Sequence, residues 1–437
     1  MTATGAIWRN WGRTEKVKPV RVERPASAEA VQRAVSAGVR QGHRIKAVGA
    51  GHSFTGIAVA PGVMLELTDL QGVIAVDEDR QRVTLAAGTR LFRLPELLRP
   101  YGLALQNMGD IDRQTISGAT STGTHGTGGR FGGLATQITG VRMATADGEL
   151  LTIDENENSE LLPAVRVGLG ALGVLVEVTI QCVPSFVLQA VERPEPLEET
   201  LGSYLERSAT ADHFEFYWFP HTETALTKTN TRLPVDAGRQ PLGRLERWVG
   251  DELLANGLYR GVCAVGTVVP SAIPPFSRLA QRLTGNRSFT DYSPKVFVSD
   301  RAVRFREMEY ALPREAVPDA LREVRTLIEK RGWRISFPIE VRSAAADDNL
   351  LSTAHGRETG YIAVHRYFRE NPEEYFRAVE RIMVAHDGRP HWGKMHYRNA
   401  DGLRKVYPQF DEFLAIRDRL DPARVFGNPY LTRVLGD

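Results

Sequence analysis

The sequence predicts an α+β protein built from two domains. Its 437 residues exceed what a single hydrophobic core normally organises. Helical and strand patterns are mixed without the regular βαβ alternation of a doubly wound sheet. Pro194 and Pro196 interrupt the pattern near the middle of the chain, as expected of a crossing between domains. We therefore expect one domain over residues 1–186 and a second over residues 187–437.

The N-terminal half shows short strands and turns around one helix. Ser27 is a typical helix N-cap, and Val31, Val35 and Val39 follow it at four-residue spacing. Gly42 is placed to end this helix. Strands are expected over residues 44–48, 63–67, 82–86, 140–153 (folded into a hairpin at Asp147 and Gly148) and 174–180.

The C-terminal half combines longer strands with amphipathic helices, which indicates a second α+β unit. Helices are expected over residues 318–330 and 373–386, and strands over residues 214–219, 303–311, 333–341 and 361–367. Residues 233–275 are rich in proline and glycine, and the pattern assigns no element there.

Composition excludes several classes of partner. Lys and Arg number 55 against 53 Asp and Glu, a net charge of +2, so no nucleic-acid surface is indicated. Cys182 and Cys263 lack C-x-x-C spacing and are expected to be buried thiols, with neither a metal site nor a disulfide. We see no signal peptide in residues 1–18 and no integral membrane segment. A cytoplasmic protein with small, neutral partners is expected, and peripheral membrane association stays open.

Two glycine-rich turns indicate a cofactor site. Residues 47–55 (AVGAGHSFT) follow an apolar strand, and residues 117–128 (SGATSTGTHGTG) interleave glycines with hydroxyl side chains. Glycines let backbone N–H groups approach a pyrophosphate closely, and the hydroxyls add further donors. Either turn alone is compatible with a surface loop, but the two together indicate a dinucleotide held along its length.

A literal dinucleotide fingerprint, GLGALG at residues 168–173, does not indicate a Rossmann site. A Rossmann fingerprint opens a helix, whereas the β-branched residues that follow here predict a strand. We therefore exclude a nicotinamide cofactor. These glycines are interpreted as a tight turn that either approaches the cofactor or packs on a neighbouring strand.

Four motifs in order carry a resemblance to a known family. They are residues 48–53, residues 117–128, residues 170–174 and PHWGK at residues 390–394. Nearly end to end, the chain resembles the aldonolactone oxidoreductases of the vanillyl-alcohol-oxidase flavoprotein superfamily, the D-arabinono-1,4-lactone oxidase family. It is more similar to the bacterial L-gulono-1,4-lactone dehydrogenases and oxidases than to alditol oxidases.

The resemblance implies a PCMH-type FAD-binding domain and an α+β substrate (cap) domain, with residues from about 391 to 437 returning to the FAD domain. It implies oxidation of a sugar lactone such as L-gulono-, L-galactono- or D-arabinono-1,4-lactone by hydride transfer to flavin N5, giving an ascorbate-type product. Two alternatives remain open: an alditol oxidase, and a nonenzymatic FAD-binding redox protein.

The resemblance also implies which residues hold FAD. His52 stands where the family bonds the 8α-methyl group of the flavin, so covalent FAD is expected. His125 matches the second family turn, but a structural hydrogen-bonding role is the preferred interpretation for it. The implied FAD contacts are Val48, Gly49, Ala50, Gly51, His52, Ser53, Gly109, Asp110, Thr115, Ser117, Gly118, Ser121, Thr122, Gly123, His125, Gly173, Val174 and Asn428.

Glu340 and Arg342 lie two residues apart on a predicted strand and therefore share one of its faces. Their spacing alone favours an exposed ion pair. The resemblance instead implies that they face the sugar. There a carboxylate and a forked donor orient hydroxyl groups and assist loss of a hydroxyl proton.

The resemblance implies roles for three more residues at the substrate. Lys394, in an aromatic segment, would stabilise anionic reduced flavin near N1. His365 stands where alditol oxidases have threonine. It either acts on the substrate, as a base or a lactone ligand, or is a structural histidine. Asp110 either binds a lactone hydroxyl or caps a turn.

Gly109 is the small residue that the resemblance places over the flavin face. A glycine there leaves a path for O2, which predicts oxidase activity with release of hydrogen peroxide. The alternative electron acceptors are a cytochrome and a quinone.

Overall fold

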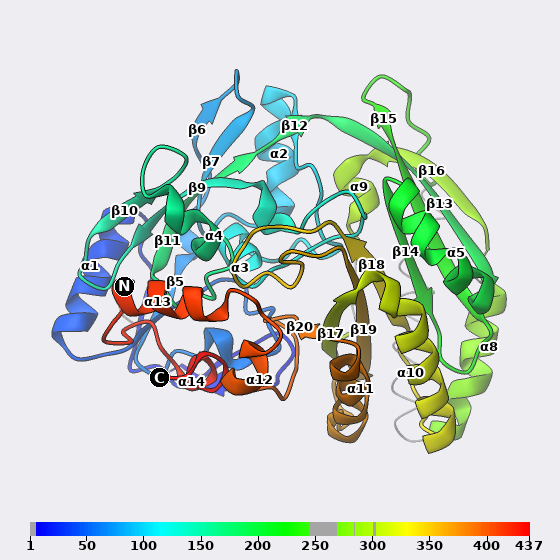
Figure 1. Cartoon of the computed structure of the whole chain (residues 1–437). Coiled ribbons are helices and arrows are strands. Elements are labelled where there is room, and N and C mark those ends of the chain that lie inside the picture. Colours follow the sequence, from blue (N-terminus) through cyan, green and yellow to red (C-terminus); the bar gives the residue numbers. More distant parts are fainter. Residues whose placement is uncertain (1–5, 244–268, 284, 300–302) are drawn as a thin grey trace.

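The computed structural model describes residues 6–243, 269–283, 285–299 and 303–437. Two sheet-containing halves lie side by side in Figure 1, the N-terminal half in blue to cyan and the other in green to orange. The last helices of the chain, in red, lie with the N-terminal half. Cys263 lies outside the described residues. Cys182 is a buried thiol, as predicted, and burial raises its pKa to about 12.

The N-terminal half contains a five-stranded antiparallel sheet in the order β10-β9-β11-β7-β6 and a three-stranded parallel sheet in the order β3-β5-β4. The strands are β3 (Arg21–Glu23), β4 (Ile45–Val48), β5 (Val63–Glu66), β6 (Val73–Asp77), β7 (Arg82–Ala86), β9 (Ile138–Ala144), β10 (Leu150–Ile153) and β11 (Val174–Gln181). Short strand pairs are formed by β1 (Trp8–Arg9) with β2 (Lys16–Val17) and by β8 (Leu103–Ala104) with β12 (Val183–Pro184).

Helix α1 (Ala28–Arg40) is the predicted N-terminal helix. The Ser27 hydroxyl accepts the Ala30 N–H at 3.2 Å and so caps its first turn. Val31 and Val35 are fully buried against the parallel sheet and β11. The other helices of this half are α2 (Leu94–Leu98), α3 (Ile116–Ser121) and α4 (Leu162–Val165). The strands predicted in this half are all confirmed, as is the strand rather than helix after residue 173.

The other half is organised by an antiparallel eight-stranded sheet in the order β16-β13-β15-β14-β18-β19-β17-β20. Its strands are β13 (Phe186–Pro196), β14 (His213–Trp218), β15 (Thr224–Pro234), β16 (Arg287–Tyr292), β17 (Phe305–Pro313), β18 (Ile339–Ala344), β19 (Thr359–Tyr367) and β20 (Arg389–Pro390). The helices are α5 (Leu197–Thr210), α8 (Ile273–Leu283), α9 (Ser293–Phe297), α10 (Val317–Arg331) and α11 (Glu373–Ala385).

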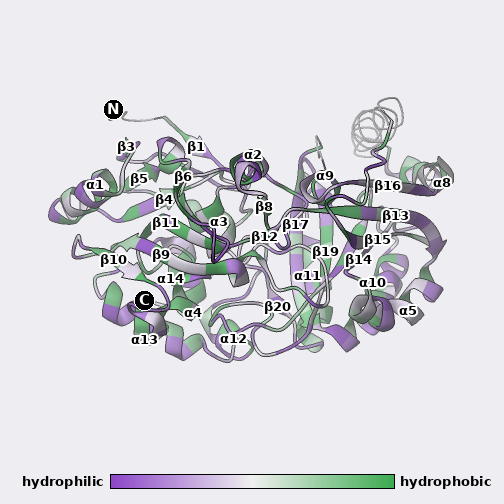
Figure 2. Ribbon diagram, turned by 90° about the horizontal axis from the view of Figure 1, so that it is seen from above, coloured by the Kyte–Doolittle hydropathy of each residue, from purple (hydrophilic) through white to green (hydrophobic). Residues whose placement is uncertain are grey.

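Helices α5, α10 and α11 cover one face of this sheet (Figure 1). Apolar residues at alternate positions of β14, β17, β18 and β19 pack against them. In Figure 2 the helix ribbons change between purple and green along their length, as expected of helices with one buried side. The intervening strand residues face the opposite way, and that second face is also buried.

Two sequence expectations are wrong. The segment at residues 193–196 does not leave regular structure, because β13 continues to Pro196 and pairs with β15 throughout. Its prolines are tolerated because β16 pairs only as far as Glu192, and within the described part of the chain no other strand pairs with that edge at Pro194 and Pro196. The strand expected over residues 333–341 begins only at Ile339, after Pro338, which lacks the N–H that a central strand needs.

The C-terminal helices α12 (Ala400–Arg404), α13 (Phe410–Leu420) and α14 (Pro429–Leu435) pack on the N-terminal half. The Ile45 N–H donates to the Val425 carbonyl at 2.8 Å. Asn428 caps α14 and also donates to the carbonyls of Gly56, Ile57 and Val59 at 3.0, 3.1 and 2.9 Å. The domain boundaries themselves stay a prediction. Among the residues described, none of the helices is both long and apolar enough to span a membrane.

Asn428→Ala should lower the free energy of unfolding by about 2–4 kcal/mol, because it removes a helix cap and leaves buried carbonyls without a donor. The matched control is Asn399→Ala, since exposed Asn399 caps α12 in the same way but binds no distant segment. The control should lose about 1 kcal/mol. Denaturant unfolding measures both variants. Equal losses of unfolding free energy would show that the bonds from Asn428 to the carbonyls of Gly56, Ile57 and Val59 add no stability.

Candidate active site

A groove lies where β4 ends and α3 begins. The three glycine-containing turns of the sequence meet in it. The predicted FAD contacts that line it are Val48, Gly49, Ala50, Gly51, His52, Ser53, Thr115, Ser117, Gly118, Ser121, Thr122 and Gly173.

Glycine is required where these turns cross other segments. A Cβ at Gly49 would lie 2.3 Å from the Thr115 hydroxyl oxygen, and one at Gly173 would lie 2.7 Å from the Ala144 carbonyl oxygen. The Thr115 hydroxyl is itself occupied, because it accepts the Gly118 N–H at 3.2 Å as the cap of α3. The close approach leaves backbone N–H groups and hydroxyls along the groove, which suits the phosphates of a dinucleotide.

The remaining predicted FAD contacts surround the groove without lining it. Gly123 follows α3 with φ +77°, and Val174 is buried at the start of β11. Asn428 holds the C-terminal helix, as described above. Gly109 lies against the His125 backbone, where an alanine Cβ would be 3.0 Å from the carbonyl oxygen.

The lining residues Ala47, Leu169 and Gly170 belong to the predicted turns. Sequence reasoning missed part of the lining: Lys46, Ile57, Ala58, Leu67, Gln114 and Leu175. Lys46 is the informative one, because its ammonium donates to the carbonyls of Leu169, Gly170 and Phe426 at 3.3, 2.7 and 3.2 Å. Burial lowers the pKa of Lys46 to about 7, against an opposing effect of Asp421. A lysine inside an otherwise apolar strand was the available signal.

His52 lines the groove beside Trp11, with ring centroids 5.7 Å apart and the rings stacked at 20°. Burial, together with the positive charges of Arg90, Lys394 and Arg113, lowers the pKa of His52 to about 4. The imidazole is therefore neutral at pH 7 and has a free lone pair, as a nucleophile requires.

Arg342 is the centre of a buried charge cluster on the second face of the large sheet. It pairs with Glu340, with Glu215 at 3.0 Å and with Asp110 at 3.2 Å. Glu340 and Arg342 are only 3% and 7% exposed, so the surface ion pair that spacing alone favoured is wrong. Glu215 was missed, although an acidic residue inside the apolar strand β14 was a usable signal. Burial lowers the pKa of Arg342, but Asp110, Glu340 and Glu215 more than reverse this and hold it well above its usual value.

Lys394 and His365 meet a carboxylate that sequence reasoning also missed. The Lys394 ammonium binds Glu307 at 2.5 Å, and Nε2 of His365 lies 3.6 Å from the other oxygen of Glu307. Nδ1 of His365 donates to the Pro338 carbonyl at 3.0 Å. Burial opposes the charge on Glu307, but Lys394 and His365 hold its pKa well below the usual range.

The groove and the charged face meet through the loop at residues 391–395. The Phe54 N–H donates to the Gly393 carbonyl at 2.7 Å, and the Thr55 hydroxyl donates to the Trp392 carbonyl at 3.0 Å. The His52 turn and the Lys394 loop are thereby tied together. Lys394 accordingly lies close enough to contribute to the lowered pKa of His52.

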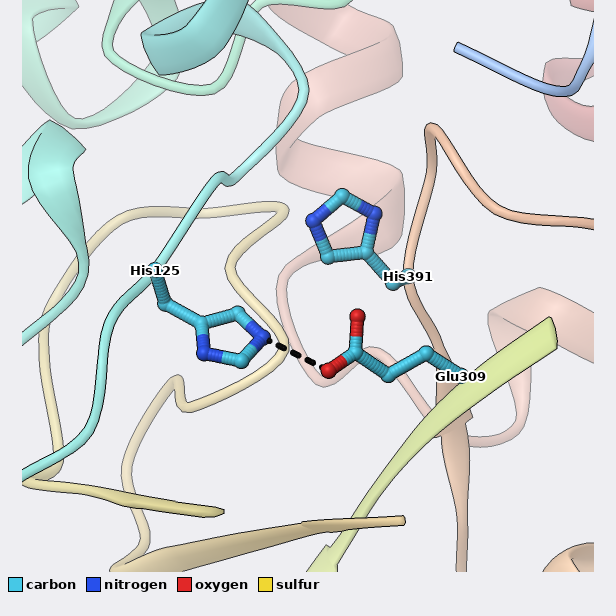
Figure 3. A group of neighbouring side chains, drawn as sticks. All are labelled: His125, Glu309 and His391. Carbon is cyan, nitrogen blue, oxygen red and sulfur yellow. Dashed lines mark ion pairs between the residues drawn. The ribbon is translucent and has the colours of Figure 1, made fainter. Parts of the chain in front are cut away.

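His125, Glu309 and His391 form a second buried cluster (Figure 3). Nε2 of His125 faces Glu309 at 3.1 Å, while its Nδ1 donates to the Gly126 carbonyl at 2.8 Å. Nδ1 of His391 accepts the Gly393 N–H at 3.0 Å, so its proton is on Nε2 and neither nitrogen suits a metal. The contacts of both His125 ring nitrogens with protein groups favour the structural role for this residue.

Comparisons with known proteins agree with this geometry. Residues 178–434 match the family model of D-arabinono-1,4-lactone oxidase, and residues 19–154 match an FAD binding domain. The chain belongs to the D-arabinono-1,4-lactone oxidase family. This confirms the predicted resemblance, the FAD cofactor and an aldonolactone oxidoreductase.

Three relatives show the range of similar proteins. The chain is 45% identical over 430 residues to the L-gulono-1,4-lactone dehydrogenase of Mycobacterium tuberculosis (strain ATCC 25618 / H37Rv), covering 98% of this chain and 99% of the relative. It is 34% identical over 437 residues to the L-gulonolactone oxidase of Bos taurus, covering 98% of each. An alditol oxidase of Streptomyces sp. (strain IKD472 / FERM P-14339) is 31% identical over 434 residues, again covering 98% of each.

The fold is also found among solved structures. Cholesterol oxidase from B. sterolicum matches with a TM-score of 0.81 at 18% identity, covering 100% of this chain and 97% of that one. This likeness concerns the fold alone. It confirms the predicted α+β architecture of the FAD-binding type.

Arg342→Met should lower the free energy of unfolding by about 3–5 kcal/mol, because it strands three buried carboxylates without their shared cation. Arg377→Met is the control, since Arg377 forms an exposed pair with Glu373 one helical turn away. The control should change stability by about 0.5 kcal/mol or less. Denaturant unfolding of the two variants compares their stabilities. If Arg342→Met lost as little unfolding free energy as Arg377→Met, water would be solvating the carboxylates of the cluster.

Proposed function

We propose that the protein oxidises L-gulono-1,4-lactone or a close stereochemical relative, the L-galactono- or D-arabinono-1,4-lactone, to an ascorbate-type product. The buried cluster around Arg342 carries the proposal. It sets fixed carboxylate and guanidinium groups beside the groove, and these are the groups that bind several hydroxyls of a small neutral sugar. The lactone dehydrogenase and oxidases among the relatives support the same class of substrate.

The groove suits FAD, which supplies a two-electron acceptor when it is bound. The backbone of residues 49–53 and the hydroxyls of Ser117 and Ser121 would hold its phosphates, and His52 would bond its flavin ring. We further propose that residues 1–186, together with residues from about 391 to 437, make up the FAD domain, because Asn428 and Lys46 tie the two segments.

Each charged residue has a distinct proposed task. Arg342, fixed by three carboxylates, donates to substrate hydroxyls, and Glu340 accepts the proton of the hydroxyl that is oxidised. Lys394 keeps a positive charge beside the reduced cofactor. Nδ1 of His365 is fixed by the Pro338 carbonyl and its Nε2 lies 3.6 Å from Glu307, so we assign His365 to positioning rather than to proton abstraction.

The location and the acceptor are proposals as well. We propose that the protein works in the cytoplasm, which the buried free thiol of Cys182 supports. The relatives divide between a dehydrogenase and oxidases, so they do not choose the acceptor. We propose that O2 is used, because Gly109 has no side chain to obstruct its approach.

Anaerobic addition of L-gulono-1,4-lactone should bleach the flavin absorbance of the wild type, whereas open-chain alditols should not at equal concentration. Bleaching by the alditol alone would favour a polyol oxidase, and bleaching by neither would favour a nonenzymatic FAD protein.

Lys394→Met should slow the anaerobic bleaching by the lactone, because it raises the activation free energy by about 2–4 kcal/mol. Lys405→Met, an exposed lysine on the same segment, is the control and should keep the wild-type rate.

His52→Ala should leave FAD bound but extractable by acid, while the wild type should retain it covalently. The control His43→Ala should also retain it, because His43 is not among the residues that line the groove. Attachment in wild-type apoprotein should be nearly as complete at pH 5.5 as at pH 8. The reason is that a pKa of about 4 leaves His52 neutral, whereas an ordinary histidine at about 6.5 would be largely protonated at the lower pH. Acid precipitation followed by absorbance of the pellet measures both results. Free FAD from the wild type would refute the covalent link.

Reduced wild type should be reoxidised by O2 with release of hydrogen peroxide. Stopped-flow absorbance in oxygenated buffer, compared with a quinone and with cytochrome c, provides the test. Faster reoxidation by the quinone or cytochrome would reassign the acceptor. Gly109→Ala does not serve as a clean probe of oxygen access, because its Cβ would also press on the His125 carbonyl.

A further inference from the structure

Strand β17 places two acidic side chains on the face of the sheet that carries the charged groups. Met308 and Tyr310 of this strand pack against the helices, so Glu307 and Glu309 point the other way. Both are about 4% exposed. A carboxylate buried to this degree needs a specific partner, and the partners of the two residues differ.

The partner of Glu307 is brought to it by the backbone. The Met395 N–H donates to the Glu307 carbonyl at 2.9 Å, and the His391 N–H donates to the Glu309 carbonyl at 3.0 Å. These two bonds lay the loop at residues 391–395 along β17. The Lys394 ammonium then reaches the Glu307 carboxylate at 2.5 Å.

The Glu307 carboxylate also limits where Lys394 can move. Its second oxygen lies 3.6 Å from Nε2 of His365, a ring already fixed through Nδ1 by the Pro338 carbonyl. One carboxylate therefore connects β17, β19 and the loop that carries the lysine. The Lys394 side chain keeps a 21% exposed side and lies 5.5 Å from the Phe54 ring, toward the His52 end of the groove.

We propose that Glu307 is a positioning residue for Lys394: it holds the ammonium group at the flavin end of the groove and keeps it charged there. This rests on the proposed function, in which Lys394 supplies the positive charge beside the cofactor. Burial alone would lower the pKa of Lys394, and the carboxylates of Glu307 and Glu309 reverse this and raise it. Without Glu307, a buried lysine would lose its proton at a lower pH.

Other titratable groups surround this pair on every side. Glu309 is on the same strand, His365 is on β19, His391 is on the loop, and His125, His52 and Asp110 are on the turns of the N-terminal half. Glu309 is the informative control. It shares the strand, the face and the burial of Glu307, but its direct ion-pair partner is His125.

The test is the flavin midpoint potential of the holoenzyme, measured by dye equilibration from about pH 7 to pH 10, which requires no lactone. Relative to wild type, the equilibrium constant for flavin reduction in Glu307→Gln should fall by about tenfold or more as the pH rises, because Lys394 loses its charge early. Glu307→Asp should restore most of the wild-type dependence. Glu309→Gln should show a smaller pH-dependent change, since it removes charge but no contact to Lys394.

The same measurement in a Lys394→Met background completes a double-mutant cycle. There Glu307→Gln should add no pH-dependent change. A Glu307→Gln potential that tracks wild type at every pH, or an equal pH-dependent effect with and without Lys394, would overturn the proposal. If Glu307→Gln does not fold, Glu307→Asp in both backgrounds gives the same comparison, with a smaller shift expected.

The outcomes separate this inference from the proposed function. If the lactone does not bleach the wild type but the Glu307 variants show the expected potentials, the proposed substrate is rejected and the positioning role of Glu307 is retained. Bleaching by the lactone with potentials that do not depend on Glu307 would reject only the positioning role.

Discussion

The structure depends on a sheet that is buried on both faces with opposite chemistry. In the eight-stranded sheet, alternate residues of β14, β17, β18 and β19 form an apolar core with three helices. The intervening residues bring Glu215, Glu307, Glu309, Glu340, Arg342 and His365 to the other face, which is buried too. Charges removed from water are tolerated only in pairs or hydrogen-bonded groups, so each of these side chains constrains its neighbours.

That constraint determines where the two halves meet. The loop at residues 391–395 is bonded to β17 on one side and to the His52 turn on the other. The groove and the charged face that we propose for the substrate thus adjoin through a few hydrogen bonds to backbone carbonyls. Groups held in this way need little rearrangement when charge develops during a reaction.

The C-terminal segment gives the groove its support from the other direction. Lys46 donates to the carbonyls of the turn at residues 168–173 and of Phe426, and Asn428 holds the carbonyls of residues 56–59. These are single side chains that satisfy several backbone acceptors at once. A binding site made from glycine-rich turns, which have little intrinsic rigidity, gains its fixed shape from such contacts.

Local sequence was sufficient for several of the regular elements and for the cofactor, but it assigned no element to α5, β13, β15 or α13. Ser27 with its spaced valines predicts α1, and the β-branched run after Gly173 predicts β11 and excludes a Rossmann helix. The glycine-rich turns predict a dinucleotide groove, and the resemblance they carry leads to FAD. These predictions succeed because caps, periodicity and close backbone approach are properties of neighbouring residues.

Only the tertiary structure decided which charges act together. Spacing alone predicts a surface pair for Glu340 and Arg342. The resemblance puts them and Asp110 at the substrate, but nothing in the sequence joins Glu215 to them or shows that Arg342 pairs with all three carboxylates. The prediction at Pro194 was wrong for a related reason. A proline ends a strand when a neighbouring strand needs its N–H, and it is tolerated when no strand pairs with that side, as found here among the described residues. Burial, pairing and strand neighbours depend on contacts between distant segments, and these exist only in the folded chain.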